Sequence, residues 1–185
     1  ALGYFPGLLK VAPKDAELRL AYAASLAESG KQAEAETQVR KAMADHPEST
    51  HVRFALGEIL LRRGKTREAA AAFADAVRLN PEAIEPYIAL ARLESGRKNH
   101  SASARHYEAA LGIAPFNRNV LRAWADELKK SNQIDATIKR LVRSHPDDEA
   151  SWYRAAVLYK SKGNLGAASS LYRRLSMRNP NLPPL

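Results

Sequence analysis

Few side chains in this sequence stand in a pattern that could support catalysis. The five histidines are His46, His51, His100, His106 and His145. No pair has the HExxH spacing of a zinc site, and the interval between His100 and His106 does not place both on one helix face. The histidines therefore give no indication of a metal centre.

Nucleophiles and phosphate-binding loops of the common enzyme classes are also missing from the sequence. There is no cysteine, which excludes a thiolate nucleophile, a disulfide and a cysteine-ligated metal. No GxSxG motif and no glycine-rich phosphate loop occurs. The acidic run Asp147-Asp148-Glu149 is better explained as the start of a helix, where the macrodipole favours anions. We therefore expect no enzymatic activity, no metal and no cofactor.

Basic side chains concentrate toward the C-terminal end, while the whole chain carries a net charge of +9. A basic patch is expected there, formed by Arg154, Lys160, Lys162, Arg173, Arg174 and Arg178. Such a patch could attract a polyanion: a nucleic acid, an acidic protein or an anionic polysaccharide. Since Trp152 and Tyr172 are predicted to be buried rather than free for base stacking, we do not expect nucleic acid to bind.

The elements that carry these residues are predicted to be helices. Alanine dominates the apolar residues and strand formers are few. The stretch 64–81, GKTREAAAAFADAVRLNP, is typical of one amphipathic helix, with Thr66 as its N-cap and Pro81 after its end. No apolar run is long enough for membrane insertion, so a soluble chain is expected, in the cytoplasm or the periplasm. Because the chain begins without Met, we expect an excised or processed piece of a longer protein.

Prolines and small residues recur at a nearly constant interval. Successive prolines are 34 residues apart except for one interval of 31, and they are Pro13, Pro47, Pro81, Pro115, Pro146 and Pro180. Upstream of them a small, bulky, small pattern repeats, as in Ala35-Val39-Ala42, Ala69-Phe73-Ala76 and Ser103-Tyr107-Ala110. This period and pattern resemble the tetratricopeptide repeat (TPR) family, with two helices per unit.

The resemblance implies an all-α, right-handed superhelical solenoid of about five helix-turn-helix units over residues 15–180. The expected units are 15–48, 49–82, 83–116, 117–147 and 148–180, after a repeat remnant or short helix at 1–14 and before a tail at 181–185. Two departures from the pattern are expected to matter. Arg97-Lys98-Asn99 replaces the usual turn glycine, and the short fourth unit predicts a shortened turn at Ser131–Gln133.

In the TPR family the first helix of each unit lines a concave groove, so the resemblance also implies where a partner would bind. The expected peptide-groove residues are Phe54, Arg62, Ile88, Arg92, Arg122, Lys129 and Tyr153. Arginines would grip the carboxylates of an acidic protein or peptide, and Phe54 and Tyr153 would anchor its apolar side chains. The alternative is that these charges are merely solvated or paired with Glu58 and Asp126. The carboxylate clamp of some family members is not expected, because the face carries no Asn before Asn119.

We therefore favour a non-catalytic scaffold or adaptor that binds a protein segment in the groove. Two alternatives stay open. The chain could be a structural spacer in a larger protein, for example one of bacterial assembly, secretion or polysaccharide export. It could also bind a polyanion through its basic C-terminal repeat. Ends that lack a polar cap further predict association of copies into a homo-oligomer.

Overall fold

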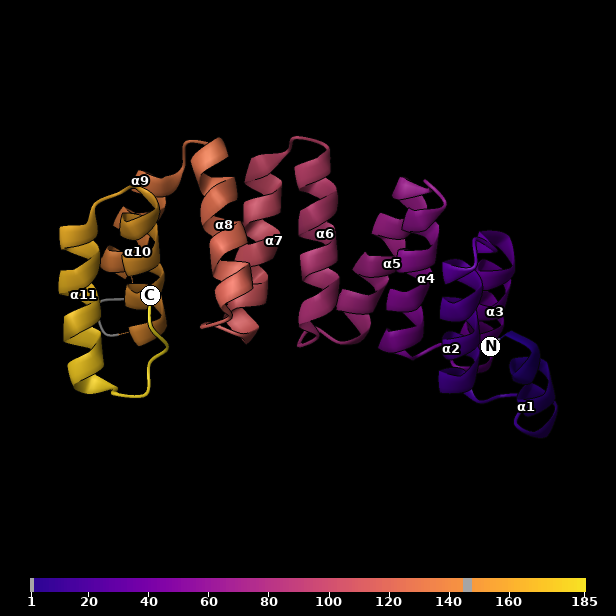
Figure 1. The fold of residues 1–185 in the computed structure, drawn as a ribbon. Coiled ribbons are helices and arrows are strands. Elements are labelled where there is room, and N and C mark those ends of the chain that lie inside the picture. Colours follow the sequence, from indigo (N-terminus) through magenta and orange to yellow (C-terminus); the bar gives the residue numbers. More distant parts are fainter. Residues whose placement is uncertain (1, 145–147) are drawn as a thin grey trace. The chain divides into compact units, whose positions relative to one another are not determined.

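The computed structural model describes residues 2–144 and 148–185, and every regular element in these two ranges is a helix (Figure 1). The helices are η1 (Leu2–Tyr4), α1 (Phe5–Val11), α2 (Ala16–Glu28), α3 (Gln32–Asp45), α4 (Thr50–Arg62), α5 (Thr66–Leu79), α6 (Ile84–Gly96), α7 (His100–Ile113), α8 (Arg118–Lys130), α9 (Ile134–Ser144), α10 (Glu149–Ser161) and α11 (Leu165–Arg178). His145, Pro146 and Asp147, which the sequence analysis names, lie outside the described residues. The prediction of an all-α chain is confirmed.

The helices form two compact units, Ala1–Leu90 and Ala91–Leu185. In the first unit α2 packs against α3, α3 against α4, and α4 against α5. In the second unit α7 packs against α8, while α10 contacts α8, α9 and α11. These helices therefore cover the apolar sides of their neighbours in the chain, as expected for stacked helix pairs.

The turn inside each helix pair has one residue with a left-handed backbone. These residues are Gly30 (φ 79°), Gly64 (φ 72°), Lys98 (φ 62°), Asn132 (φ 56°) and Gly163 (φ 80°). At the second turn Lys65 N donates to Leu60 O at 2.9 Å, and Asn99 N donates to Glu94 O at 2.9 Å at the third. This i→i−5 bond satisfies a carbonyl at the end of the preceding helix. The third turn therefore keeps the regular geometry without a glycine.

The short fourth unit differs from the sequence expectation. Its turn, Ser131–Gln133, separates α8 from α9 by three residues, as many as separate α4 from α5. The fourth unit is shorter because its second helix is shorter: α9 has 11 residues, whereas α5 has 14. The prediction of a shortened turn is wrong because Asn132 adopts the required positive φ, which asparagine tolerates better than most residues.

Capping side chains start four of the first helices in their pairs. The side chains of Asp15, Ser49, Asn117 and Asp148 each accept a backbone N–H of the first helical turn. The interpretation of Asp148 as a helix start is confirmed. Thr66 is not an N-cap, because α5 begins at Thr66 itself and has no side-chain cap.

The N-terminal stretch forms the short helix that was one of its two expected states. Pro6 lies in the first turn of α1, where its missing N–H costs no helical hydrogen bond. The Phe5 ring stacks on Tyr22 with 5.0 Å between centroids, which fastens α1 to α2. On the solvent side, Tyr4 and Val11 remain largely exposed.

Candidate functional site

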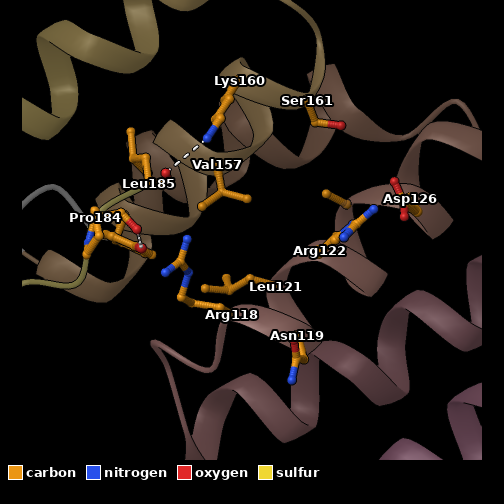
Figure 2. A pocket seen from close by; sticks show the side chains of 12 residues that line it. Arg118, Asn119, Leu121, Arg122, Asp126, Val157, Lys160, Ser161, Pro184 and Leu185 are labelled. Atoms are coloured by element: carbon orange, nitrogen blue, oxygen red, sulfur yellow. Dashed lines mark hydrogen bonds between the residues drawn. The ribbon is translucent and has the colours of Figure 1, made fainter.

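A pocket of the second unit lies between α8, α10 and the last residues of the chain (Figure 2). Its volume is about 810 Å³. It is lined by Arg118, Asn119, Leu121, Arg122, Ala125, Asp126, Tyr153, Val157, Lys160, Ser161, Pro184 and Leu185. Arg122, Tyr153 and Lys160 among these are residues singled out from the sequence.

Helical spacing brings the lining side chains onto facing sides of two helices. Arg118 and Arg122 are four residues apart on α8, and Tyr153 and Val157 are four residues apart on α10, so each pair shares one face. Behind the arginines, Leu121 is buried in the core at 2% exposure. Packing of α8 against α10 therefore fixes the backbone positions from which Arg118 and Arg122 extend.

The pocket carries an excess of positive charge. Arg118, Arg122 and Lys160 are exposed, and Asp126 is the single acid among the lining residues. In the part of the chain that the structure describes, no Asp or Glu side chain pairs with Arg118, Arg122 or Lys160 within 4.0 Å, and Lys160 instead donates to the backbone oxygen of Leu185. The expected alternative, in which Asp126 pairs with a neighbouring arginine, is therefore not what is observed. Figure 2 shows Arg118 extending from α8 into the space beside Pro184 and Val157.

Tyr153 is buried rather than free to anchor a partner. Its side chain is 1% exposed, since Phe116 meets its ring edge-on at 5.3 Å and Tyr172 at 6.4 Å between centroids. Its hydroxyl donates to Pro184 O at 3.2 Å. Burial raises the pKa of the Tyr153 phenol and Tyr172 adds to this, with Arg118 acting in the opposite direction. Tyr153 therefore stays a neutral hydrogen-bond donor in the pocket wall.

The tail, residues 181–185, folds back onto the α10 side of its helix pair (Figure 1). Leu182 is buried at 7% exposure, and its carbonyl oxygen accepts from the Tyr172 hydroxyl at 3.4 Å. Lys160 Nζ donates to the backbone oxygen of Leu185 at 2.9 Å, the bond drawn in Figure 2. The tail thus forms one wall of the pocket, which the sequence did not indicate.

A smaller pocket of about 260 Å³ lies in the same unit next to Lys129. Its lining includes Asp135 and Lys162, which form an ion pair with each other. Lys129 is exposed and lines this smaller pocket, whereas Arg122 lines the pocket of about 810 Å³.

The remaining predicted groove residues are divided between the two compact units. Phe54, Arg62 and Ile88 belong to the first unit. Phe54 is half-buried with its ring 5.5 Å from that of Phe73, Ile88 is half-buried, and Arg62 is exposed. Arg92 is exposed in the second unit and does not line either pocket.

The six residues of the predicted basic patch have different surroundings. Arg154 is half-buried and donates to the carbonyl oxygen of Leu111, and burial lowers the pKa of its guanidinium. Lys160 and Lys162 face the two pockets. The exposed basic surface of α11 comprises Arg173, Arg174 and Arg178.

Trp152, expected to be buried, is only half-buried, because it lies at the surface under Arg174. The Arg174 guanidinium lies 4.8 Å from the centroid of its ring. This is a cation–π contact that covers the exposed ring face.

Two buried carboxylates were missed by the sequence reading. Glu127 is 4% exposed and accepts from Ser95 Oγ at 3.0 Å and Lys130 Nζ at 2.7 Å, with His100 Nδ1 2.8 Å away. Glu36 is 6% exposed among Arg40, Arg63 and Lys65. Both join neighbouring repeats and neither borders a pocket, so we assign them a structural role.

Arg118 was also missed, although a usable signal exists. It stands four residues before Arg122, which places it on the same helix face. It was missed because the predicted groove face of this helix begins at Asn119, three residues before Arg122.

Residues 2–144 and 148–185 contain neither a metal-binding cluster nor a membrane-spanning helix. No group of three His, Asp or Glu side chains there could hold a metal ion. No helix in the same ranges is long and apolar enough to cross a membrane.

Models of the tetratricopeptide repeat match most of the chain. One model matches residues 25–84 and 54–118, and a second matches residues 149–182. A comparison with curated protein sequences finds no match.

Solved structures of TPR proteins resemble the chain in fold. MamA aligns with a TM-score of 0.64 at 17% identity, over 89% of this chain and 84% of its own. PilF of Pseudomonas aeruginosa gives 0.65 at 19%, over 96% and 82%. YrrB, described as a TPR protein with an unusual peptide-binding site, gives 0.62 at 16%, over 98% and 95%.

At these identities the structural matches show the fold alone. The family models cover more than half of the residues and coincide with the helix pairs described above. The chain therefore belongs to the tetratricopeptide repeat family.

Proposed function

We propose that this chain is a non-catalytic scaffold that binds an extended protein segment with acidic side chains at the pocket between α8 and α10. The observation that carries the proposal is the set of three exposed cations, Arg118, Arg122 and Lys160, around a pocket of about 810 Å³ with one acid. Guanidinium groups bind carboxylates through two parallel hydrogen bonds. A volume of this size accommodates several side chains of a bound segment.

The pocket also supplies apolar surface for specificity. Val157 from α10 and Ala125 from α8 line it between the charged groups. Tyr153 contributes a hydrogen-bond donor rather than a free ring, because its side chain is buried. The bound segment would place its carboxylates at the two arginines and a small apolar side chain against Val157.

Other predicted groove residues enter the proposal as secondary contacts. Lys129 lies at the smaller pocket beside the same helix and would meet a longer segment. In the first unit, exposed Arg62 with half-buried Phe54 and Ile88 would offer a separate contact. The peptide-binding site named for YrrB is a property of that protein. The similar fold of this chain is consistent with binding a peptide.

Fluorescence polarisation with an acidic probe tests the proposal. The probe is a fluorescein-labelled ten-residue peptide with four Asp or Glu and three Leu residues, and its control carries Asn and Gln instead. Changing Arg118→Glu and Arg122→Glu together should weaken binding at least about tenfold, because two charge-assisted contacts become repulsive. Changing Arg173→Glu and Arg178→Glu on α11 adds the same charge at the other helix and should leave affinity unchanged. Equal loss in both variants, or none in either, would contradict the proposal.

The exposed arginines of α11 favour a second candidate function, polyanion binding. Arg173, Arg174 and Arg178 are exposed on α11, and this helix contains no acidic residue. Heparin is a suitable probe, and its binding would depend on Arg173 and Arg178 but not on Arg118 and Arg122. Retention on heparin by the α11 variant would exclude this candidate.

Association of copies remains a proposal that concerns α1 and α11. Val11 is 86% exposed on α1, and Met177 is 76% exposed on α11. Apolar side chains so exposed favour contact with another apolar surface. Light scattering of Val11→Ser and Met177→Ser variants would show a smaller mass than the unchanged chain if these side chains join copies, and the same mass if they do not.

A further inference from the structure

The tail is held by the second unit in the way that a bound peptide would be. Tyr153, Tyr172 and Lys160 donate to the carbonyl oxygens of Pro184, Leu182 and Leu185 respectively. All three donors are side chains and all three acceptors are backbone atoms. This pattern recognises an extended backbone independently of most of its side chains.

One side chain of the tail supplies an apolar anchor. Leu182 is only 7% exposed, whereas Pro184 beside it is exposed. A turn in which Leu182 N donates to Asn179 O at 3.3 Å directs the chain from the end of α11 back toward α10. The anchor and the three backbone bonds therefore act along one short segment.

Proline gives this segment a preset conformation. Pro183 and Pro184 have fixed φ angles, and a residue that precedes a proline is biased toward extended backbone. Consecutive prolines favour polyproline II, whose carbonyl groups are not used by the helix itself. The Leu-Pro-Pro-Leu sequence thus loses little conformational entropy on binding and offers free acceptors to Tyr153, Tyr172 and Lys160.

The tail does not fill the space beside it. Pro184 and Leu185 form only one wall of the pocket of about 810 Å³, and Arg118 extends into the open part (Figure 2). A longer segment could run along the same donors and continue past the arginines.

We propose that the α10 face beside this pocket is a binding site for extended, proline-containing segments with a leucine anchor, and that residues 182–185 occupy part of it in cis. This rests on the proposed function for the location of the site, and it adds the chemistry of the backbone that is recognised. An external segment must then displace the tail to reach Tyr153, Tyr172 and Lys160, whereas Arg118 and Arg122 lie in the part of the pocket that the tail leaves open. Because the tail competes for this site, a partner must bind with enough affinity to displace it, and a weak partner does not.

The size of that threshold follows from tethering. A ligand on a short linker acts at an effective concentration of about 1 mM. If the same segment binds in trans with a Kd of about 0.1 mM, occupancy in cis weakens its apparent binding about tenfold.

The test uses the full chain and a neutral peptide that copies the tail. The probe is fluorescein-labelled Asn-Leu-Pro-Pro-Leu with blocked ends, measured by fluorescence polarisation. Leu182→Ser removes the anchor of the cis segment and should strengthen binding of the probe about tenfold over the unchanged chain. In the Leu182→Ser background, Tyr153→Phe removes one donor and should weaken the probe about three- to tenfold, while Tyr159→Phe on the same helix should not change it.

A second variant guards against loss of folding in Leu182→Ser. Pro184→Ser alters an exposed residue and makes the tail more flexible, so it should strengthen probe binding about threefold. Probe binding that is no stronger in either tail variant than in the unchanged chain would overturn the proposal, and so would equal effects of Tyr153→Phe and Tyr159→Phe.

The outcomes also separate this inference from the proposed function. The peptide of this probe has no carboxylate, and the acidic peptide carries the same dye, so Arg118→Glu with Arg122→Glu should leave the affinity of the neutral probe within about twofold. If the neutral probe behaves as expected while the acidic peptide ignores the arginines, the cis site stands and the acidic partner is wrong. The reverse result would overturn cis occupancy alone.

Discussion

Lys98 occupies the same turn position as Gly64, with φ 62° against 72° for the glycine 34 residues earlier. Lysine has a Cβ, which in this backbone region lies close to the following carbonyl and costs about 1–2 kcal/mol. Asn132 and Gly163 continue the series in the next turns. The repeat thus imposes a left-handed residue even where the sequence offers an unfavourable one.

Replacement of Lys98 by glycine is expected to stabilise the second unit. Relief of the left-handed strain outweighs the larger entropy of glycine in the unfolded chain, so the free energy of unfolding should rise by about 0.5–1 kcal/mol. Urea unfolding measures this free energy. Asn132→Gly serves as the control and should raise the free energy of unfolding by less than Lys98→Gly does. A decrease in stability for Lys98→Gly would show that the lysine side chain makes a contact worth more than the strain.

The carboxylate of Glu36 is expected to stabilise the first unit. Its oxygens accept from Arg40 at 2.8 Å and from Lys65 at 3.3 Å, and Arg63 pairs with it as well. Glu36→Gln should lower the free energy of unfolding by about 2 kcal/mol, because charged hydrogen bonds are lost at a buried position. Glu34→Gln on the same helix removes only an exposed pair with Lys31 and should change it by less than about 0.5 kcal/mol. Equal effects of the two changes would contradict the assignment.

The same carboxylate predicts a pH dependence. Burial raises the pKa of Glu36, but hydrogen bonds from Arg40, Arg63 and Lys65 outweigh burial and leave that pKa below its ordinary value of 4.5. A carboxyl group with a lowered pKa stabilises the fold fully above its unfolded pKa, and this contribution is lost as the pH falls through the folded pKa. Denaturation curves between about pH 6 and pH 2 should therefore converge for Glu36→Gln and the unchanged chain at the acid end. A difference that stays constant would rule out ionisation as the cause.

Gly57 is expected to tolerate no side chain. A Cβ there would clash with the ring of Phe73, whose side chain is fully buried. Gly57→Ala should destabilise the first unit by about 1–3 kcal/mol through overpacking. Gly112→Ala in α7, where a Cβ would meet nothing within 4 Å, should instead stabilise by about 0.5–1 kcal/mol from helix propensity. Both are read from thermal unfolding, and a stabilising Gly57→Ala would mean that Phe73 can move.

Local signals predicted the helices and failed where distant residues decide the outcome. Pro47 and Pro81 end helices through their own backbone chemistry, so their interval correctly indicated the helix pairs. The short fourth unit was misplaced because a shorter turn and a shorter α9 give the same proline interval. Tyr153 was expected to be free, and its burial depends on where Phe116 and the tail pack.

The two-dimensional NMR spectrum of the isotopically labelled chain, titrated with the acidic ten-residue peptide, tests the central claim most directly. Binding at the proposed pocket predicts chemical-shift changes concentrated on α8, α10 and the tail, including the side-chain Nε–Hε signals of Arg118 and Arg122. These changes should weaken as salt is raised from about 50 to 500 mM, because the contacts are charge pairs. Changes confined to α11 or to the first unit would contradict the account.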